Sequence, residues 1–296
     1  MRIILTGAGG FVGQEVRRCL QDRHEVVAID QMLNGASGIE GDLCDKVTIE
    51  NAFAGGCDAV IHLATLPGGA AELDPALAKR INIDVTMALV DAASLAGNRP
   101  RFIFASSIAV FGNSLPALID DGTLPAPVMI YGAHKAMMES WIEAQTRRGA
   151  ISGLSLRLPG IVARPKGPSG MKSAFMSDVF HALNAGQTIE LPVSPEATMW
   201  LMSLQRVAAN LVHALQIEAT GTCTLPAIRT SMRDLVQAIA SATQTDPALA
   251  TYAPDMALEA GFGRQPPLST SAAEAMGFTN DRSVDALVAS ALLAFA

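Results

Sequence analysis

The chain has 296 residues, of which 50% are hydrophobic and 17% charged, and this composition excludes an intrinsically disordered protein. Its length is more than a single domain usually has and is enough for a large core. The formal net charge is −7 and no block of lysine and arginine occurs, so a nucleic-acid partner is not expected.

The cysteines and histidines are scattered. Cys19, Cys44, Cys57 and Cys223 form no CxxC pair, which suits a reducing compartment, and the five histidines lack metal-ligand spacing. We therefore expect no metal. The N-terminus enters a strand directly, and the apolar tail 284–296 is too short to span a bilayer, so it is expected to be a helix packed on the body. The expected setting is the cytoplasm, without a membrane partner.

The first segment predicts a strand, a glycine turn and a helix. An apolar run over residues 2–5 is followed by Gly7, Gly10 and Gly13 and then by apolar residues at helical spacing. In a dinucleotide-binding turn the first glycine permits the sharp bend, the second lets a pyrophosphate approach, and the third lets the helix pack closely. The pyrophosphate then lies on N–H groups at the positive helix terminus. Glycines also serve ordinary strand-to-helix turns, so this signal needs support.

The second predicted strand supplies that support. It covers residues 24–29 and ends in Asp30, 17 residues after Gly13. A carboxylate there can accept both hydroxyls of an adenosine ribose and repels a 2′-phosphate. The alternative is that Asp30 only begins a solvent loop. No arginine or lysine follows in residues 31–35, so the sequence favours NAD over NADP as the cofactor.

Further strands and helices alternate up to residue 158. Strands are expected at 58–64, 101–105 and 154–158, and helices at about 73–96 and 129–148. Asp42 and Leu43 precede the first of these strands, where they either flank an adenine or are an ordinary loop acid and a core leucine. The alternation predicts an α/β fold, with a doubly wound (Rossmann) parallel sheet and helices on both faces.

The composition changes after Pro159, where proline and glycine cluster. The expected helices also become shorter, at 171–185, 203–217 and 231–243. Residues 188–193 are an expected edge strand. We expect an NAD-binding domain with the catalytic residues over 1–165 and a smaller C-terminal substrate-binding lobe over 166–296, both within one compact body.

Tyr131 and Lys135 are four residues apart and lie on one face of the predicted helix. A tyrosine with a pKa of about 10 needs a depression of about three units, or about 4 kcal/mol, to act as a base near neutrality. An ammonium about 5 Å away supplies about 3 kcal/mol at an effective dielectric of about 20. A cationic nicotinamide can supply the remainder. The alternative is a surface tyrosine and a solvated lysine.

Ser106 and Ser107 end the strand that precedes this helix. A hydroxyl at the carboxyl edge of the sheet can donate to a substrate oxygen while Tyr131 moves the proton. Serines at a strand end also commonly cap the next turn.

Together these features resemble the extended branch of the short-chain dehydrogenase/reductase superfamily, which includes NAD-dependent epimerases and dehydratases. The matching segments are 6–13, 42–43, 62–64, 106–112, 131–135 and 156–159. The resemblance implies that Ser107 polarises the substrate, that Tyr131 is the acid/base, and that Lys135 holds the nicotinamide ribose. It also implies a homodimer formed through the helices at 73–96 and 129–148. Phe111 stands where many members have tyrosine.

The resemblance further assigns Asn82 to steadying the active-site helix. The cofactor contacts that it implies are Gly7, Gly10, Phe11, Val12, Asp30, Asp42, Leu43, Leu63, Ala64, Asn82, Tyr131, Lys135 and Pro159.

Within that branch, residues 157–165, 173–175, 191–193, 200 and 213–215 resemble D-erythronate dehydrogenases, which oxidise a small sugar acid with NAD. Arg164 could bind a substrate carboxylate bidentately, with Ser173 or Lys172 as further donors, or it could pair with a surface acid. Trp200 could wall the pocket or belong to the core.

The sequence thus predicts an NAD-dependent oxidoreductase that acts on a secondary hydroxyl of a small polyhydroxy acid such as D-erythronate. A nucleotide-sugar epimerase or dehydratase with tightly held NAD is the alternative, since Arg164, Lys166 and Lys172 could anchor a diphosphate. A dehydratase needs an acid beside the polarising hydroxyl, and Ile108 and Ala109 follow Ser107 instead. A catalytically idle NAD binder is a third reading.

Overall fold

The computed structural model of the protein describes residues 1–166 and 173–295, and the chain divides into two compact units. The first unit comprises residues 1–110, 125–158 and 208–224, and the second comprises 111–124, 159–207 and the chain from 225 onward. Three segments differ from a single boundary at residue 165, namely 111–124, 159–165 and 208–224. The segment 208–224 belongs to the first unit because strand β10 (Gly221–Thr224) pairs with strand β6 (Ser152–Leu158).

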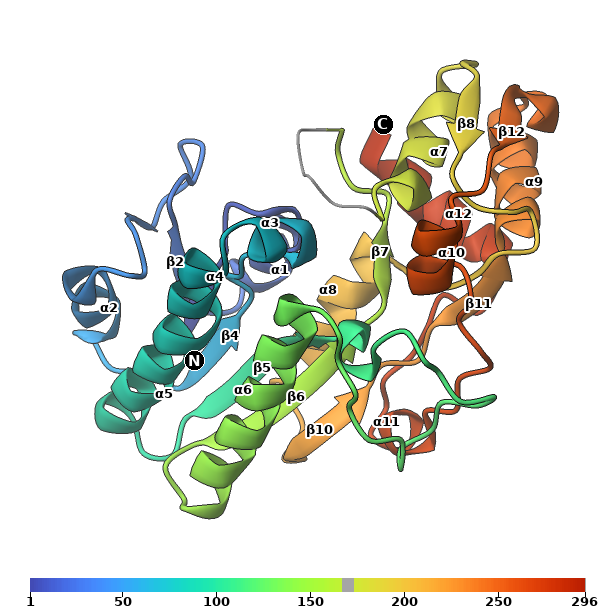
Figure 1. Ribbon diagram of the computed structural model, residues 1–296. Helices are drawn as coiled ribbons and strands as arrows, with labels where there is room; N and C mark the ends of the chain where they lie inside the picture. The colour runs from blue at the N-terminus through green and yellow to red at the C-terminus, as the bar shows by residue number, and fades with distance from the viewer. Residues whose placement is uncertain (167–172, 296) are drawn as a thin grey trace. The chain divides into compact units, whose positions relative to one another are not determined.

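The first unit contains a seven-stranded parallel sheet in the order β10-β6-β5-β4-β1-β2-β3 (Figure 1). Its other strands are β1 (Arg2–Thr6), β2 (Glu25–Asp30), β3 (Ile39–Glu40), β4 (Ala59–His62) and β5 (Arg101–Ser107). The expected doubly wound α/β fold is confirmed. The strand order reverses between β1 and β4, and in such sheets ligands bind at the carboxyl ends of the strands at this point.

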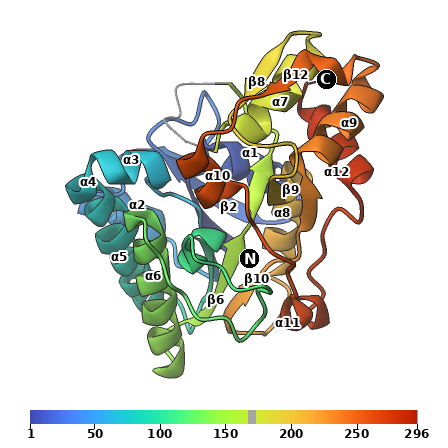
Figure 2. The ribbon, with the colours of Figure 1, turned by 45° about the vertical axis from the view of Figure 1, so that its right-hand side comes forward.

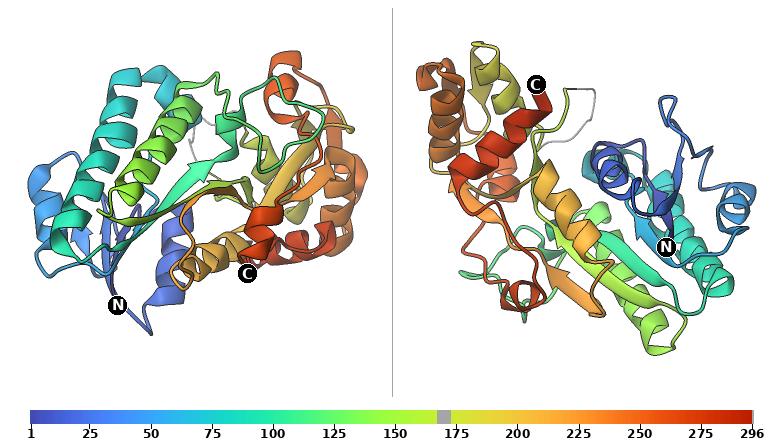
Figure 3. Two further views of the ribbon diagram at one scale, coloured as in Figure 1. Left: turned by 90° about the horizontal axis from the view of Figure 1, so that it is seen from below. Right: turned by 180° about the vertical axis from the view of Figure 1, so that it is seen from behind.

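Helices cover both faces of this sheet. They are α1 (Phe11–Leu20), α2 (Lys46–Phe53), α3 (Gly68–Leu73), α4 (Pro75–Lys79), α5 (Val85–Ala96) and α6 (Ile130–Arg147). On one face α2, α5 and α6 contribute to a core with strand residues that include Ile4, Val60 and Phe102. Helices α5 and α6 lie side by side there, while α1 lies on the opposite face (Figure 2 and Figure 3).

The long helix expected at 73–96 is interrupted in the structure. Helix α3 ends at Leu73, and Asp74 caps α4 by accepting a hydrogen bond of 2.9 Å from the amide of Leu77. Pro75 explains the break, because proline disfavours a helical conformation in the residue before it. A turn of π-helix over Arg80–Asp84 then joins α4 to α5 and carries Asn82.

The second unit contains two small sheets (Figure 2). One has the order β11-β9-β7 and consists of β7 (Gly160–Val162), β9 (Thr198–Ser203) and β11 (Ile228–Ser231). The other pairs β8 (Ile189–Leu191) with β12 (Ala250–Tyr252), so the edge strand expected at 188–193 is confirmed. Trp200 on β9 is 1% exposed and donates to the carbonyl of Pro266 at 2.8 Å, which makes it a core residue.

The helices of the second unit are α7 (Phe175–Asn184), α8 (Leu204–His213), α9 (Met232–Thr243), α10 (Met256–Phe262), α11 (Ser271–Ala275) and α12 (Val284–Leu292). The C-terminal half of α8 belongs to the first unit. The expected C-terminal helix is α12, which buries Leu287 and Val288. Among the residues that the structure describes, no helix is long and apolar enough to cross a membrane.

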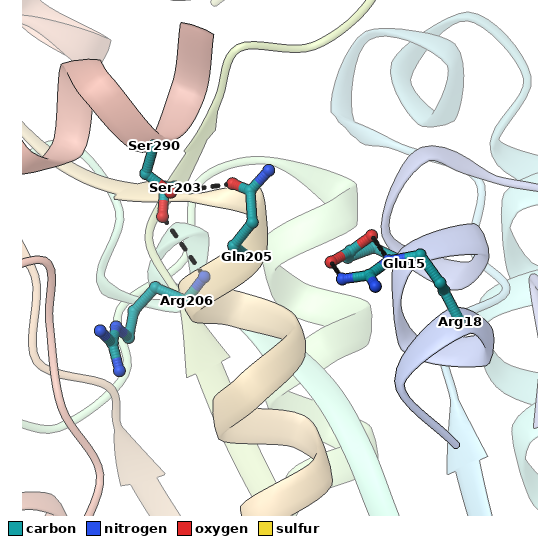
Figure 4. Close-up of polar contacts among 6 residues, drawn as sticks. All are labelled: Glu15, Arg18, Ser203, Gln205, Arg206 and Ser290. Atoms are coloured by element: carbon teal, nitrogen blue, oxygen red, sulfur yellow. Dashed lines mark hydrogen bonds and ion pairs between the residues drawn. The ribbon is translucent and has the colours of Figure 1, made fainter. Parts of the chain in front are cut away.

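Polar side-chain contacts occur on α1 and at the start of α8 (Figure 4). On α1, Glu15 and Arg18 form an ion pair one turn apart, which at an exposed position contributes little stability. At the start of α8, Ser203 accepts from the amide of Arg206 at 3.3 Å and donates to the buried Asp281 at 2.5 Å. The side chain of Gln205 accepts from Ser290 on α12 at 3.0 Å. These contacts anchor α8 within the second unit.

Candidate functional site

The glycine turn between β1 and α1 leaves no room for side chains. Gly7 has a φ of +68°, and a Cβ at this position would lie 2.7 Å from the backbone nitrogen of Ala64. A Cβ at Gly13 would lie 2.0 Å from the carbonyl oxygen of Gly7. Gly10 is the N-cap of α1 and offers no capping side chain, so the amides of Phe11 and Val12 have no acceptor within the helix. Such a helix terminus is suited to bind an anion.

Asp30 lies at the end of β2 and is bonded to this turn. Its Oδ2 accepts from the amide of Gly9 at 2.9 Å, and its Oδ1 accepts from the amide of Gln31 at 2.7 Å. The two bonds fix the plane of the carboxylate. A carboxylate has about four acceptor positions, so two remain for a pair of hydroxyl groups.

Two further predicted segments follow strands of this sheet, residues 63–64 after β4 and residues 42–43 after β3. After β4, the amide of Leu63 donates to the carbonyl of Thr6 at 3.2 Å, and the amide of Ala64 donates to the Thr6 hydroxyl at 3.3 Å. The structure thus joins the Leu63–Ala64 segment to the end of β1. Asp42 accepts from the amide of Cys44 at 2.8 Å, and Leu43 packs partly on the core.

Asn82 is 3% exposed, and its side chain bonds to the loop that follows β4. Its Oδ1 accepts from the hydroxyl of Thr65 at 2.9 Å and from the amide of Leu66 at 2.8 Å, and its Nδ2 donates to the carbonyl of Leu66 at 3.0 Å. The π-helical turn that carries Asn82 also packs against α6. Asn82 therefore connects the loop after β4 with the helix that carries Tyr131.

Tyr131 and Lys135 lie on one face of α6, next to the end of β5. The Lys135 Nζ is 5.5 Å from the centre of the Tyr131 ring, close to the separation assumed from the sequence. It donates to the carbonyl of Ala105 at 2.7 Å and lies 4.6 Å from the centre of the Phe104 ring. Burial lowers the pKa of Lys135 to about 7, while the charge of Glu139 acts to raise it.

Ser107 is the last residue of β5, and its hydroxyl accepts from the amide of Ala109 at 3.1 Å. The neighbouring Ser106 points to the other face of the strand, as alternation requires, and is 2% exposed. Its hydroxyl donates to Glu139 at 2.5 Å. The two adjacent serines thus have different environments, and Ser107 is the more accessible one.

Sequence reasoning missed two charged residues of this site. Glu139 is 5% exposed and accepts two hydrogen bonds from Arg157 on β6, at 3.0 and 2.8 Å. A signal was available, because Glu139 follows Lys135 by four residues and so shares its helix face. Its partner Arg157 could be found only from the sheet, where it is opposite Ser106.

The remaining predicted residues belong to the second unit. Pro159 directly follows β6. The amide of Arg164 donates to the Ser177 hydroxyl at 3.0 Å, and its carbonyl accepts from the ring of His181 at 2.6 Å, so the backbone at Arg164 is fixed to α7. The carbonyl of Ser173 accepts from the amide of Met176 at the start of α7. Lys172 lies outside the described residues.

The sheet and the turn define a class of enzymes that bind a dinucleotide at the carboxyl ends of parallel strands. The sequence matches the NAD dependent epimerase/dehydratase family over residues 3–221. The chain belongs to this family. It is an NAD-dependent oxidoreductase, and the glycine turn, the free helix terminus and the carboxylate of Asp30 fit its cofactor.

Similar proteins include dehydrogenases and an epimerase. The chain is 30% identical to D-erythronate dehydrogenase from Cupriavidus necator over 97% of both chains. It is 33% identical to D-erythronate dehydrogenase from Haemophilus influenzae over 73% of both. The solved structure of a nucleoside-diphosphate-sugar epimerase from Agrobacterium tumefaciens is also similar, with a TM-score of 0.87 and 29% identity, covering 97% of this chain and 92% of that chain.

Proposed function

We propose that the protein oxidises a secondary hydroxyl group of a small polyhydroxy acid such as D-erythronate. The chemistry rests on one observation, the buried ammonium of Lys135 at 5.5 Å from the Tyr131 ring. The substrate class is supported by the likeness to a D-erythronate dehydrogenase over 97% of both chains.

Tyr131 removes the proton from the substrate hydroxyl. Lys135 stabilises the phenolate, since a unit charge at about 5.5 Å contributes about 3 kcal/mol at an effective dielectric of about 20. Ser107 donates a hydrogen bond to the substrate oxygen as it becomes a carbonyl. Bound NAD supplies the acceptor for the hydride.

The first unit holds this cofactor through the segments that bend around the end of β1. The amides of Phe11 and Val12 bind the pyrophosphate, with Gly7 and Gly10 allowing its approach. Asp30 accepts the ribose hydroxyls, and Asp42 and Leu43 flank the adenine. Leu63, Ala64, Asn82, Lys135 and Pro159 complete the set of proposed cofactor contacts.

Replacing Asp30 with asparagine should weaken NAD binding by about tenfold or more, because a hydrogen bond to a charged group contributes about 1.5–3 kcal/mol. NADP binding should weaken less or improve, because the repulsion of the 2′-phosphate is removed. Titration of the two cofactors by calorimetry measures both constants. An unchanged ratio of the two affinities would contradict the assignment of Asp30 to the ribose.

The second unit selects the substrate, with Arg164 binding its carboxylate and Ser173 donating a further hydrogen bond. The hydrogen bonds of the Arg164 backbone support this assignment, because they fix the position of the Cα atom from which the side chain extends. The proposal includes a homodimer in the cytoplasm. Exposed apolar residues on α5 and α6, Leu95 at 89% and Met137 at 55%, support the expected dimer surface.

A nucleotide-sugar epimerase is the second candidate function, favoured by the 29% identity to the nucleoside-diphosphate-sugar epimerase. An epimerase returns the hydride to its substrate and so regenerates its cofactor. It should therefore purify with NAD retained and produce no net NADH.

Incubation of the purified protein with NAD and a panel of sugar acids distinguishes the two functions. We expect NADH to accumulate with D-erythronate or a close analogue, and cofactor to exchange freely. The panel should also contain nucleotide-linked sugars, with product epimers analysed by chromatography. Absence of NADH with every sugar acid would overturn the leading proposal.

A further inference from the structure

We propose that Glu139 is a positioning residue for proton transfer, whose buried carboxylate keeps the neighbouring Lys135 in its charged form. This inference rests on the proposed function, in which Lys135 must carry a proton to stabilise the phenolate of Tyr131.

Three donors from two strands hold the carboxylate of Glu139. Arg157 on β6 binds both of its oxygens, at 3.0 and 2.8 Å, and Ser106 on β5 binds Oε1 at 2.5 Å. A bidentate pair of this kind fixes both the position and the plane of the carboxylate. Glu139 is therefore held one helical turn beyond Lys135, on the same face of α6.

Burial opposes the charge of Lys135, while the carbonyl of Ala105 and the faces of two aromatic rings favour it. The side chain is 3% exposed, and burial is the larger influence on its pKa. His62 on β4 is neutral and adds no positive charge beside Lys135, because burial and then the charge of Lys135 lower the pKa of its ring to about 3. Among the described groups that influence the pKa of Lys135, Glu139 is the one carboxylate.

Arg157 on β6 and Tyr131 on α6 are two further ionisable groups, the first bonded to Glu139 and the second next to Lys135. The guanidinium of Arg157 is paired with Glu139, so it mainly positions that carboxylate. In the proposed mechanism the phenol of Tyr131 loses its proton, and Lys135 stabilises the resulting phenolate. Arg157 thus positions Glu139, Glu139 keeps Lys135 charged, and Lys135 stabilises the phenolate of Tyr131.

A buried ion pair can also have a purely structural role, and such pairs are often replaceable by apolar residues without loss of stability. The two roles lead to different expectations. If Glu139 only pairs with Arg157, removing both charges together leaves Lys135 unaffected. If Glu139 acts on Lys135, the pKa of Lys135 falls whether Arg157 is present or not.

The test uses Glu139→Gln and the double variant Glu139→Gln/Arg157→Met. Glutamine keeps an acceptor for Ser106, and methionine avoids leaving a buried guanidinium unpaired. Lysine labelled with ¹³C at Cε reports the pKa of Lys135 in the cofactor-free protein. The chain has only five lysines, and the signal is assigned by its loss in Lys135→Met.

We expect the pKa of Lys135 to fall by about one unit in both variants, the size of effect that a nearby carboxylate has across a medium of intermediate dielectric. Lys135 is charged below its pKa, so a lower pKa means that its ammonium group loses the proton at a lower pH. The high-pH limb of the kcat profile should therefore move to lower pH by a similar amount. The affinity for NAD should change less than twofold.

An unchanged Lys135 titration in a folded variant would overturn the inference. Unfolding of both variants, detected by circular dichroism, would also overturn it, because it would make the role of the pair structural. The NMR titration needs neither substrate nor cofactor. Failure of the sugar-acid panel would thus remove the proposed function and leave the effect of Glu139 on Lys135 measurable.

Discussion

Replacing Tyr131 with phenylalanine is expected to lower kcat by about three orders of magnitude, within the range that one acid–base group contributes. The ring remains, so the packing of α6 and the position of Lys135 should be preserved. The affinity for NAD should change little, because the adenosine and pyrophosphate contacts lie on other elements. Steady-state kinetics with the best substrate of the panel, together with calorimetric titration of NAD, measures both quantities.

Tyr252→Phe is the matched control, since Tyr131 and Tyr252 are the two tyrosines of the chain. Tyr252 is on β12 of the second unit. It is far from Tyr131 in the sequence, and β12 belongs to a different sheet from β5. Its replacement should leave kcat unchanged. Turnover by Tyr131→Phe at more than about a tenth of the normal rate would remove Tyr131 from its assigned role, since that loss is below the range of acid–base catalysis.

Replacing Lys135 with methionine should raise the pH at which Tyr131 ionises by about two units. This follows from the loss of about 3 kcal/mol of electrostatic stabilisation at the observed separation. At neutral pH the phenolate then becomes about a hundredfold rarer and kcat falls accordingly. NAD binding should weaken too if Lys135 holds the nicotinamide ribose.

The ionisation can be observed directly in a Tyr252→Phe background, where Tyr131 is the one remaining tyrosine. Near-ultraviolet difference absorbance then follows tyrosinate formation at that residue. Lys79→Met is the control, because Lys79 is an exposed lysine paired with Asp84. An ionisation of Tyr131 at the same pH with and without Lys135 would refute the coupling between the two side chains.

Much of the first unit could be predicted from the sequence. The strands at residues 2–5, 24–29 and 101–105 and the helix at 129–148 are long or strongly patterned, and their local periodicity is enough to identify them. Several shorter strands were not foreseen. Strands β3, β7 and β12 have two or three residues each, too few for a pattern to emerge.

The cofactor turn and the Tyr131–Lys135 pair were recognisable because their chemistry depends on short spacings. The spacing of three glycines and the four-residue step on a helix are both local properties of the chain. The partners of Glu139 were not recognisable, because they come from two other strands. The role of Asn82 was assigned only by resemblance, and its hydrogen bonds to Thr65 and Leu66 required the folded chain.

The sequence by itself determined the class of sheet, the cofactor turn and the helix face that presents a phenol beside an ammonium. These features follow from steric limits at glycine and from helical periodicity, which act within a few residues. The tertiary structure decided that β10 returns to pair with β6 and that Arg157 and Ser106 both bind Glu139. Those contacts join segments 18 to 67 residues apart, and their partners are selected by packing in the sheet rather than by any local pattern.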